Sequence, residues 1–369
     1  MRIAFFGSSL VSAYWNGAAT YYRGIIRALH ARGHRITFFE PDAYDRQAHR
    51  DIDDPLWAEV VVYPPNADDA RRALASAKGF DVIVKASGVG VQDDLLEREV
   101  LELRTPSNMI AYWDVDAPAT LDRIRLNTGD PFARLIPRFD AILTYGGGEP
   151  VIDGYMALGA RKCVPIYNGL DPDTHYPVAP DARFFGDLAF LGNRLPDREK
   201  RVEDFFLKPA ASLPHKHFLL GGAGWRDKSK SANIRYFDHV YTFDHNAFNC
   251  SPRAIINISR ESMANYGFSP ATRVFEAAGA GACIITDWWR GIEMFFEPDE
   301  EILIARNGAE VIEILAALTP RRARILGQAA YRRALADHTY RHRAQQLESV
   351  LSGATLSGTS LARAGAERR

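Results

Sequence analysis

The chain has 369 residues, more than one hydrophobic core usually serves, so its length predicts two domains. Charged residues make up 25% of the sequence, but the formal net charge is only −1, so nucleic acid is not the expected partner. The three cysteines are far apart and form no CxxC pair, which argues against a zinc site or a redox motif and fits a reducing compartment.

The chain shows no pattern of a targeted or membrane-spanning protein. It enters an apolar run at once and has neither the charged start nor the cleavage site of a signal peptide. No apolar stretch reaches the roughly 18 residues of a membrane span. We therefore expect a cytoplasmic protein.

The first half of the chain alternates strand and helix patterns. Residues 2–6 form an apolar run that ends at Gly7, and apolar residues then recur at helical spacing from Ala18 to Leu29, before Gly33. This order predicts a parallel α/β sheet. The further strands that we predict here are 36–39, 60–63, 81–84, 109–113 and 141–145.

A second α/β series follows a segment with three prolines, residues 171–181, that is typical of a linker. Thr319 and Pro320 are suited to the N-cap and the first position of a helix. The last helix is expected to begin at Thr339. The strands predicted in this half are 188–191, 217–220, 254–258 and 283–286.

These patterns predict two Rossmann-like, doubly wound α/β domains facing a central cleft. Sheets of this kind bind ligands beyond the carboxyl ends of their strands, so two of them suit a two-substrate enzyme. The predicted parts are an N-terminal acceptor domain (1–170), a linker (171–184), a C-terminal donor domain (185–338), a helix (339–351) that packs back on the first domain, and a disordered tail (352–369).

The strongest local motif lies between Gly267 and Gly281. Ser269 and Pro270 are suited to the N-cap and first position of a helix, whose free N–H groups, with Thr272 in the first turn, would bind phosphate. Arg273 would add positive charge. Glu276 shares its face of the helix and would accept the two hydroxyls of a ribose. The alternative is an exposed ion pair between Arg273 and Glu276.

A second loop follows the predicted strand 188–191. Gly192 and Asn193 are followed by Arg194 and Arg198, an arrangement that would surround a diphosphate. Two solvated arginines on an ordinary loop are the alternative.

The first loop of the chain contains Ser8, Trp15, Asn16 and Gly17. It lacks the G-x-G-x-x-G pattern, so it is no dinucleotide fingerprint. Trp15 would form a flat wall against a sugar ring, while Asn16 and the backbone bind its hydroxyls. The alternative for Trp15 is core packing.

Two carboxylates, Asp114 and Asp116, follow the predicted strand 109–113. We favour Asp116 as a general base on an acceptor hydroxyl. A D-x-D pair can instead hold Mg²⁺ or Mn²⁺ with a nucleotide diphosphate. The third interpretation is that Asp116 caps a helix that Pro118 begins.

The run SPATRVFEAAGAGACIITDWWRGIE, from Ser269 to Glu293, resembles the C-terminal signature of GT-B glycosyltransferases. Together with three other segments it looks more closely like the spore-maturation (CgeB-type) branch of that fold, over roughly residues 1–350. These segments are YWNGAATYYRGIIRALHARGHRITFFEPD, AYWDVDAPATL and AFLGNRLPDRE.

The resemblance implies roles for several residues. A glutamate at the position of Glu276 typically holds the donor's ribose, the loop at Gly192 would lie near the donor phosphates, and His239 and Tyr241 would pass near the base. Many retaining relatives have another glutamate eight residues earlier, where this chain has Phe268. The paired-glutamate motif is therefore absent.

We predict a metal-independent glycosyltransferase that moves a sugar from a nucleotide-diphosphate donor to the hydroxyl of a glycan, small molecule or protein. Arg198 and Arg273 would stabilise the leaving diphosphate, and no cofactor is expected. The alternatives are an NAD(P)-dependent oxidoreductase, which the broken glycine motif disfavours, and a non-catalytic nucleotide-sugar-binding protein.

An arginine-rich segment near the C-terminus would allow weak peripheral contact with an anionic membrane. A solvated helix face is the interpretation that we favour. The segment contains Arg321, Arg322, Arg324, Arg332 and Arg333.

Overall fold

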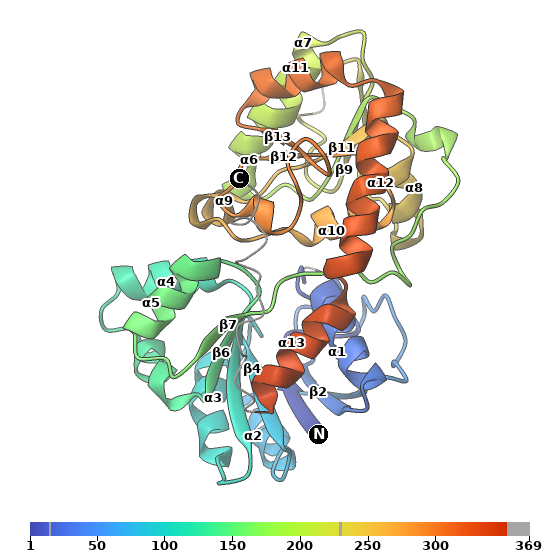
Figure 1. Cartoon of the computed structure of the whole chain (residues 1–369). Coiled ribbons are helices and arrows are strands. Elements are labelled where there is room, and N and C mark those ends of the chain that lie inside the picture. The colour runs from blue at the N-terminus through green and yellow to red at the C-terminus, as the bar shows by residue number, and fades with distance from the viewer. Residues whose placement is uncertain (15, 229–230, 353–369) are drawn as a thin grey trace. The chain divides into compact units, whose positions relative to one another are not determined.

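The computed structural model describes residues 1–14, 16–228 and 231–352, which fall into two compact units. The first unit comprises Met1–Asn168 and the helix α13, and the second comprises Gly169–Thr339 (Figure 1). Trp15 and the predicted tail after Ser352 lie outside the described residues. Each unit has its own parallel sheet and its own buried core.

The first unit is a seven-stranded parallel sheet in the order β3-β2-β1-β4-β5-β6-β7. The chain adds strands on one side of β1 and then, from β4 on, on the other side, which is the doubly wound arrangement. The strands are β1 (Arg2–Phe6), β2 (Arg35–Pro41), β3 (Glu59–Tyr63), β4 (Val82–Ala86), β5 (Met109–Asp114), β6 (Ala141–Thr144) and β7 (Cys163–Pro165).

Helices lie in the connections between these strands, except from β2 to β3, as is usual for parallel pairing. They are α1 (Ala19–Ala31), α2 (Ala67–Ser76), α3 (Asp93–Glu99), α4 (Ala117–Leu126) and α5 (Gly148–Ala157), with short 3₁₀ turns η1 (Val100–Leu103), η2 (Pro131–Arg134) and η3 (Ile136–Arg138). Gly33, with φ +88°, follows the end of α1 as expected for the residue after a helix C-cap.

The C-terminal helix α13 (Tyr340–Leu351) packs against α1 in the first unit. Gly24 of α1 makes the contact possible, because a Cβ there would lie 2.2 Å from ring atoms of Tyr340. Tyr340 is buried in the same core as Tyr21 and Leu347. The chain thus returns to the first unit after completing the second.

The second unit is a six-stranded parallel sheet in the order β10-β9-β8-β11-β12-β13. Its winding direction reverses between β8 and β11, so the ligand crevice expected of this topology lies at the carboxyl ends of those strands. The strands are β8 (Leu188–Leu191), β9 (Phe218–Gly221), β10 (Ile234–Phe237), β11 (Ala254–Asn257), β12 (Ile284–Asp287) and β13 (Leu303–Ala305).

The helices of this unit include α12, which Thr319 caps by accepting the Arg322 N–H over 3.2 Å, as predicted. The helices are α6 (Pro196–Val202), α7 (Lys208–Ser212), α8 (His245–Cys250), α9 (Glu261–Tyr266), α10 (Thr272–Gly279), α11 (Gly308–Ala317) and α12 (Pro320–Asp337). Short helical turns are η4 (Ala182–Phe184), η5 (Glu203–Leu207, a π-helical turn), η6 (Thr242–Asp244) and η7 (Ile292–Met294).

The sequence patterns predict the central strands but miss β7, β10 and β13. The segment predicted as a linker, 171–184, belongs to the second unit, where His175 is buried and η4 forms its end. Within the described residues, no helix is long and apolar enough to cross a membrane.

Candidate functional site

Two glycine loops meet at the carboxyl edge of the second sheet. The loop after β8 begins at Gly192, whose N–H donates to the Gly221 carbonyl over 2.9 Å. Gly222 has φ +118°, and a Cβ there would lie only 2.4 Å from the Gly192 carbonyl oxygen. The second loop therefore needs glycine at this position to approach the first.

Arg198 lies against the first of these loops. It is on the first turn of α6, and a Cβ on Gly192 would be 2.8 Å from its Nη1 atom. Asn193 Oδ1 accepts a hydrogen bond of 3.0 Å from the Ala223 N–H, which ties the two loops together. The structure thus brings together the three residues that we predicted for the donor phosphates in this segment.

Arg194, the other arginine of the segment, is engaged within the unit. Its guanidinium donates to Glu199 at 2.6 Å and to Asp227 at 2.9 Å. These contacts connect α6 to the loop after β9. Arg194 therefore positions the backbone of the loop, and Arg198 is the better candidate for a diphosphate contact.

Helix α10 begins later than the sequence suggests. We expected Ser269 as its cap and Pro270 as its first residue, but the helix begins at Thr272. Gly267 and Phe268 both have positive φ, 74° and 48°, and the Ser269 hydroxyl donates to the Gly267 carbonyl over 2.9 Å instead of capping a helix N–H. The predicted cap at Ser269 is therefore wrong, because Gly267 and Phe268 have positive φ and Ala271, the residue before the helix, is extended.

Glu276, on α10, lies in a largely buried cluster of ionisable side chains. Only 8% of the residue is exposed. Arg273, one turn earlier, places Nη1 3.3 Å from Glu276 Oε2, and His175 Nε2 lies 3.9 Å from Oε1. An exposed ion pair does not describe this arrangement, since both partners are largely shielded from water.

The surroundings of Glu276 favour its ionised form. Burial, the largest effect, raises the pKa of this carboxyl, but Arg273, then His175 and His245, outweigh it and hold the pKa below its usual value. Burial followed by the charge of Arg273 lowers the pKa of His245 to about 4. At neutral pH the cluster therefore combines an ionised Glu276 with an uncharged His245.

His245 connects this cluster to the loop predicted near the donor base. Its Nε2 atom is 3.2 Å from the carbonyl oxygen of Val240, between His239 and Tyr241. The rings of His239 and Tyr241 meet edge to face at 4.6 Å between centroids, and Tyr241 is 57% exposed. The Tyr241 ring is thus exposed, and the backbone of the preceding residue, Val240, contacts His245.

Sequence reasoning assigned no role to His175, because its segment has the composition of a linker. The structure buries it beside Glu276, with Nδ1 2.9 Å from the Thr174 hydroxyl. A histidine among prolines gives no signal of its own. Only the tertiary fold brings it to α10.

In the first unit, Asp114 and Asp116 occupy different environments. Asp114 ends β5 and is fully buried; its Oδ1 accepts the Asp116 N–H at 2.9 Å, and its Oδ2 accepts the hydroxyl of Tyr155. Asp116 is half-buried at the N-cap position of α4, but its side chain makes no capping hydrogen bond. Among the described residues, no three His, Cys, Asp or Glu side chains are grouped as a metal site.

The first loop is held together by its own polar side chains. Ser8 Oγ donates to Asn16 Oδ1 at 2.9 Å, and the Asn16 amide donates to the carbonyls of Ser9 and Ser12 at 2.8 and 3.0 Å. Asn16 is buried, and these bonds shape the loop. Gly17 is exposed, with open space where a Cβ would lie.

The arginine-rich segment lies on α12. Arg321, Arg322, Arg324 and Arg332 are exposed, whereas Arg333 pairs with Asp337 at 3.1 Å. A solvated helix face accounts for this arrangement.

The comparisons with known proteins agree with these observations. Residues 198–349, which include α10 and Glu276, match the family model described as glycosyl transferase-like. A comparison with curated protein sequences finds no match.

Several solved structures share both units. Sucrose-phosphate synthase from Thermosynechococcus elongatus aligns with TM-score 0.71 and 13% identity, over 96% of this chain and 98% of that one. The fold is GT-B. An alpha-glucosyltransferase in complex with UDP-glucose and abasic-site DNA aligns with TM-score 0.70 and 12% identity, over 95% and 99% of the two chains. HepE from Anabaena, in complex with UDP and glucose, aligns with TM-score 0.65 and 13% identity, over 96% and 100%.

The predicted fold class is confirmed by these GT-B structures. The family model over residues 198–349 indicates a glycosyltransferase. The finer resemblance to the CgeB-type branch is not confirmed by these comparisons.

Proposed function

We propose that this protein transfers a glycosyl group from a nucleotide-diphosphate sugar to an acceptor hydroxyl without a metal ion. The observation that carries the proposal is the buried, ionised Glu276 beside Arg273 in the part of the chain that matches the glycosyltransferase model. A carboxylate held ionised in a shielded place is a strong acceptor for paired ribose hydroxyls.

The donor diphosphate would be bound by the residues around the loop after β8. Arg198 lies against Gly192, and Arg273 is on the first turn of α10. Two fixed guanidinium groups stabilise negative charge that develops on a leaving diphosphate, without reorganising as the bond breaks. The two guanidinium groups would supply the positive charge that a metal ion supplies in D-x-D enzymes.

The base would contact the loop of His239 and Tyr241. The exposed ring of Tyr241 offers a stacking surface, and the Val240 carbonyl provides a backbone contact through His245 to the Glu276 cluster. Two of the similar structures hold UDP or UDP-glucose, so uridine nucleotides are the first to test.

In the first unit we propose that Asp116 acts as general base on the acceptor. The side chain of Asp114 is closed in by its two hydrogen-bond donors, so it supports the turn and Asp116 remains the reactive carboxylate. The residues quoted for the CgeB-type resemblance support placing the protein in that branch. The sparse, widely spaced cysteines support a cytoplasmic location.

A thermal-shift screen across nucleoside diphosphates and nucleotide sugars tests the proposal. A ligand present at 100 times its Kd stabilises the folded state by about 2.7 kcal/mol. We expect one base to stabilise the wild type and the Arg198→Gln variant to respond less, while Arg321→Gln on α12 responds like wild type. If no nucleoside diphosphate or nucleotide sugar changes the melting temperature, the donor proposal is wrong.

A further inference from the structure

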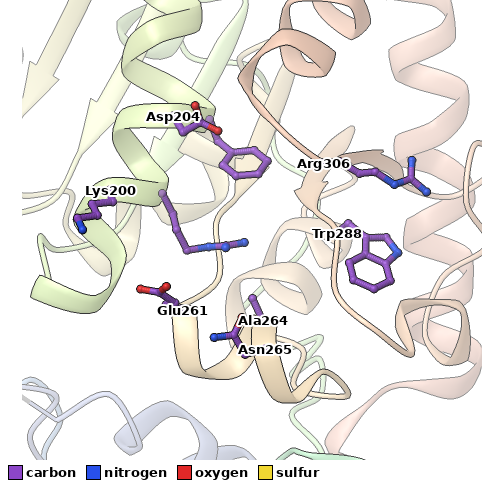
Figure 2. Close-up of a pocket in the computed structure, with 9 residues that line it drawn as sticks. Lys200, Asp204, Glu261, Ala264, Asn265, Trp288 and Arg306 are labelled. Carbon is purple, nitrogen blue, oxygen red and sulfur yellow. The ribbon is translucent and has the colours of Figure 1, made fainter.

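A cavity of about 640 Å³ opens at the carboxyl edge of the second sheet, beyond the ends of β12 and β13 (Figure 2). Its volume lies in the range of small-ligand sites. None of the residues that we assign to the donor lines it. The lining residues are Lys200, Arg201, Asp204, Phe205, Glu261, Ala264, Asn265, Trp288 and Arg306.

Several charged and polar side chains that line the cavity have no partner among the described residues. Within the described part of the chain, Lys200, Glu261 and Arg306 form no side-chain ion pair, and the Asn265 amide makes no hydrogen bond. Asp204 differs, because Lys208 lies 2.9 Å from it. The unpaired charges sum to one positive charge, so the cavity suits a ligand that carries an anionic group.

Arg201 is a fixed cation in the cavity wall. Its Nη2 atom lies 2.5 Å from Asp287 Oδ2, and Asp287, fully buried at the end of β12, also accepts the N–H of Ser259 at 3.0 Å. The guanidinium carbon lies 5.5 Å from the Phe205 ring centroid. Arg201 Nε is buried and has no hydrogen-bond partner among the described residues. Since buried donors are rarely left unpaired, this N–H is available to an acceptor from outside the chain.

Trp288 gives the cavity an aromatic wall. It is 45% exposed, whereas its neighbour Trp289 is buried at 1%. Figure 2 shows Trp288 and Arg306 on one side of the cavity and Lys200, Asp204 and Glu261 on the other. An exposed indole face among carboxylate, amide and guanidinium groups offers a sugar both an apolar surface for its C–H groups and partners for its hydroxyls.

We propose that this cavity binds an anionic saccharide, a sugar that carries a phosphate or a carboxylate. The sugar ring packs on Trp288, its anionic group contacts Arg201 and Arg306, and its hydroxyls bind Glu261 and Asn265. This second carbohydrate site goes beyond the proposed function, and it does not depend on where the donor nucleotide binds.

Isothermal titration calorimetry tests the inference on the full chain, with four probes. Glucose 6-phosphate and glucuronate carry the two anionic groups, and glucose and inorganic phosphate each supply half of the proposed ligand. We expect one of the two anionic sugars to bind at least roughly tenfold more tightly than both glucose and phosphate. Which of them binds identifies the anionic group. Phosphate that binds as tightly as the sugar phosphate would overturn the assignment to a saccharide, and so would the absence of binding by both anionic sugars.

Variants of the lining residues test whether the anionic sugar binds in this cavity. Trp288→Ala and Arg306→Gln should each lower the affinity for the anionic sugar by roughly tenfold or more. Trp288→Phe should retain most of the affinity of the wild type. The exposed residues Phe185 and Arg321 lie in the same unit outside the cavity, so Phe185→Ala and Arg321→Gln are matched controls that should bind like wild type. Arg306 is exposed, so its variant reports on binding even if Trp288→Ala folds poorly.

One further comparison separates this site from the donor site. Glu276→Ala should leave binding of the anionic sugar unchanged, and a nucleoside diphosphate should not displace it. Loss of binding in Glu276→Ala, with Trp288→Ala and Arg306→Gln unaffected, would show that the sugar occupies the donor site and would refute the second site while leaving the donor proposal intact.

Discussion

The Glu276 carboxylate lies 3.3 Å from the guanidinium of Arg273, one turn earlier on the same helix, and both side chains are largely buried. Charge pairs of this kind at a surface contribute little to stability. In a shielded position the attraction is stronger, and removing either partner leaves a costly buried charge. Arg273 therefore keeps the Glu276 carboxylate ionised in a position that is largely shielded from water.

His245 makes the second unit sensitive to acid. Burial lowers the pKa of His245 from 6.5 to about 4 in the folded protein. Between these values the unfolded chain binds a proton that the folded one does not, so stability is lost as pH falls below 6.5 and the loss is complete below about 4. Stability should fall by about 2 kcal/mol from pH 7 to pH 5.

Melting temperatures of wild type and His245→Asn at pH 7 and pH 5 measure this effect. The variant should lose less stability over the same interval. His239→Asn, a change to an exposed histidine in the neighbouring loop, is the control and should follow wild type. Equal losses in wild type and His245→Asn would show that His245 is not the titrating group.

Turnover should not require a divalent metal ion. Asp114, the first carboxylate of the D-x-D pair, is buried, and each of its oxygens already accepts a hydrogen bond. We expect release of the nucleoside diphosphate from the donor to continue in excess EDTA. Activity that disappears with EDTA and returns with Mn²⁺ would instead make Asp114 and Asp116 metal ligands.

Asp116→Asn separates a catalytic role from a capping role. If Asp116 is the general base, kcat should fall by about 10²–10⁴ while donor affinity is retained. Because the side chain makes no capping hydrogen bond, the melting temperature should change little. Asp122→Asn, on the same helix, is the matched control. Unchanged kcat with a lowered melting temperature would favour capping.

The sequence predicts the central strands of both sheets because they are fully buried apolar runs. It misses β7 and β13, which have three residues each, and β10, whose residues are only partly buried. Short edge strands leave too few residues for a periodicity to show. Pairing with the neighbouring strand, which is a tertiary contact, defines them.

The candidate site shows the same limit. Arg273, Glu276 and Arg198 lie in motifs whose local spacing is informative. The start of α10 differs from the prediction because the Phe268 N–H donates to the Arg290 carbonyl over 2.7 Å, a contact that no local pattern contains. His175 lies beside Glu276 only because of the fold, so no local sequence pattern indicates its position there.

Glu276 provides the most direct test of donor binding. Hydrogen bonds to a charged group contribute about 1.5–3 kcal/mol each, so loss of the ribose contacts in Glu276→Ala should weaken the nucleotide sugar by roughly tenfold or more. Glu276→Gln keeps the shape and some hydrogen bonding but not the charge. Its affinity for the nucleotide sugar should lie between those of the wild type and the Ala variant.

Comparing each ribonucleotide with its 2′-deoxy analogue identifies the group that Glu276 holds. Wild type should prefer the ribonucleotide, because a deoxy ligand leaves one carboxylate oxygen desolvated without a donor. Glu276→Ala should lose that preference, and Glu310→Ala, on the first turn of α11, should keep it. Removing Glu276 also leaves the partly buried Arg273 without this partner, so a lower melting temperature alone does not decide the question. The ratio of the two affinities does, since both are measured on the same folded variant: if Glu276→Ala discriminates as well as wild type, Glu276 does not bind the ribose.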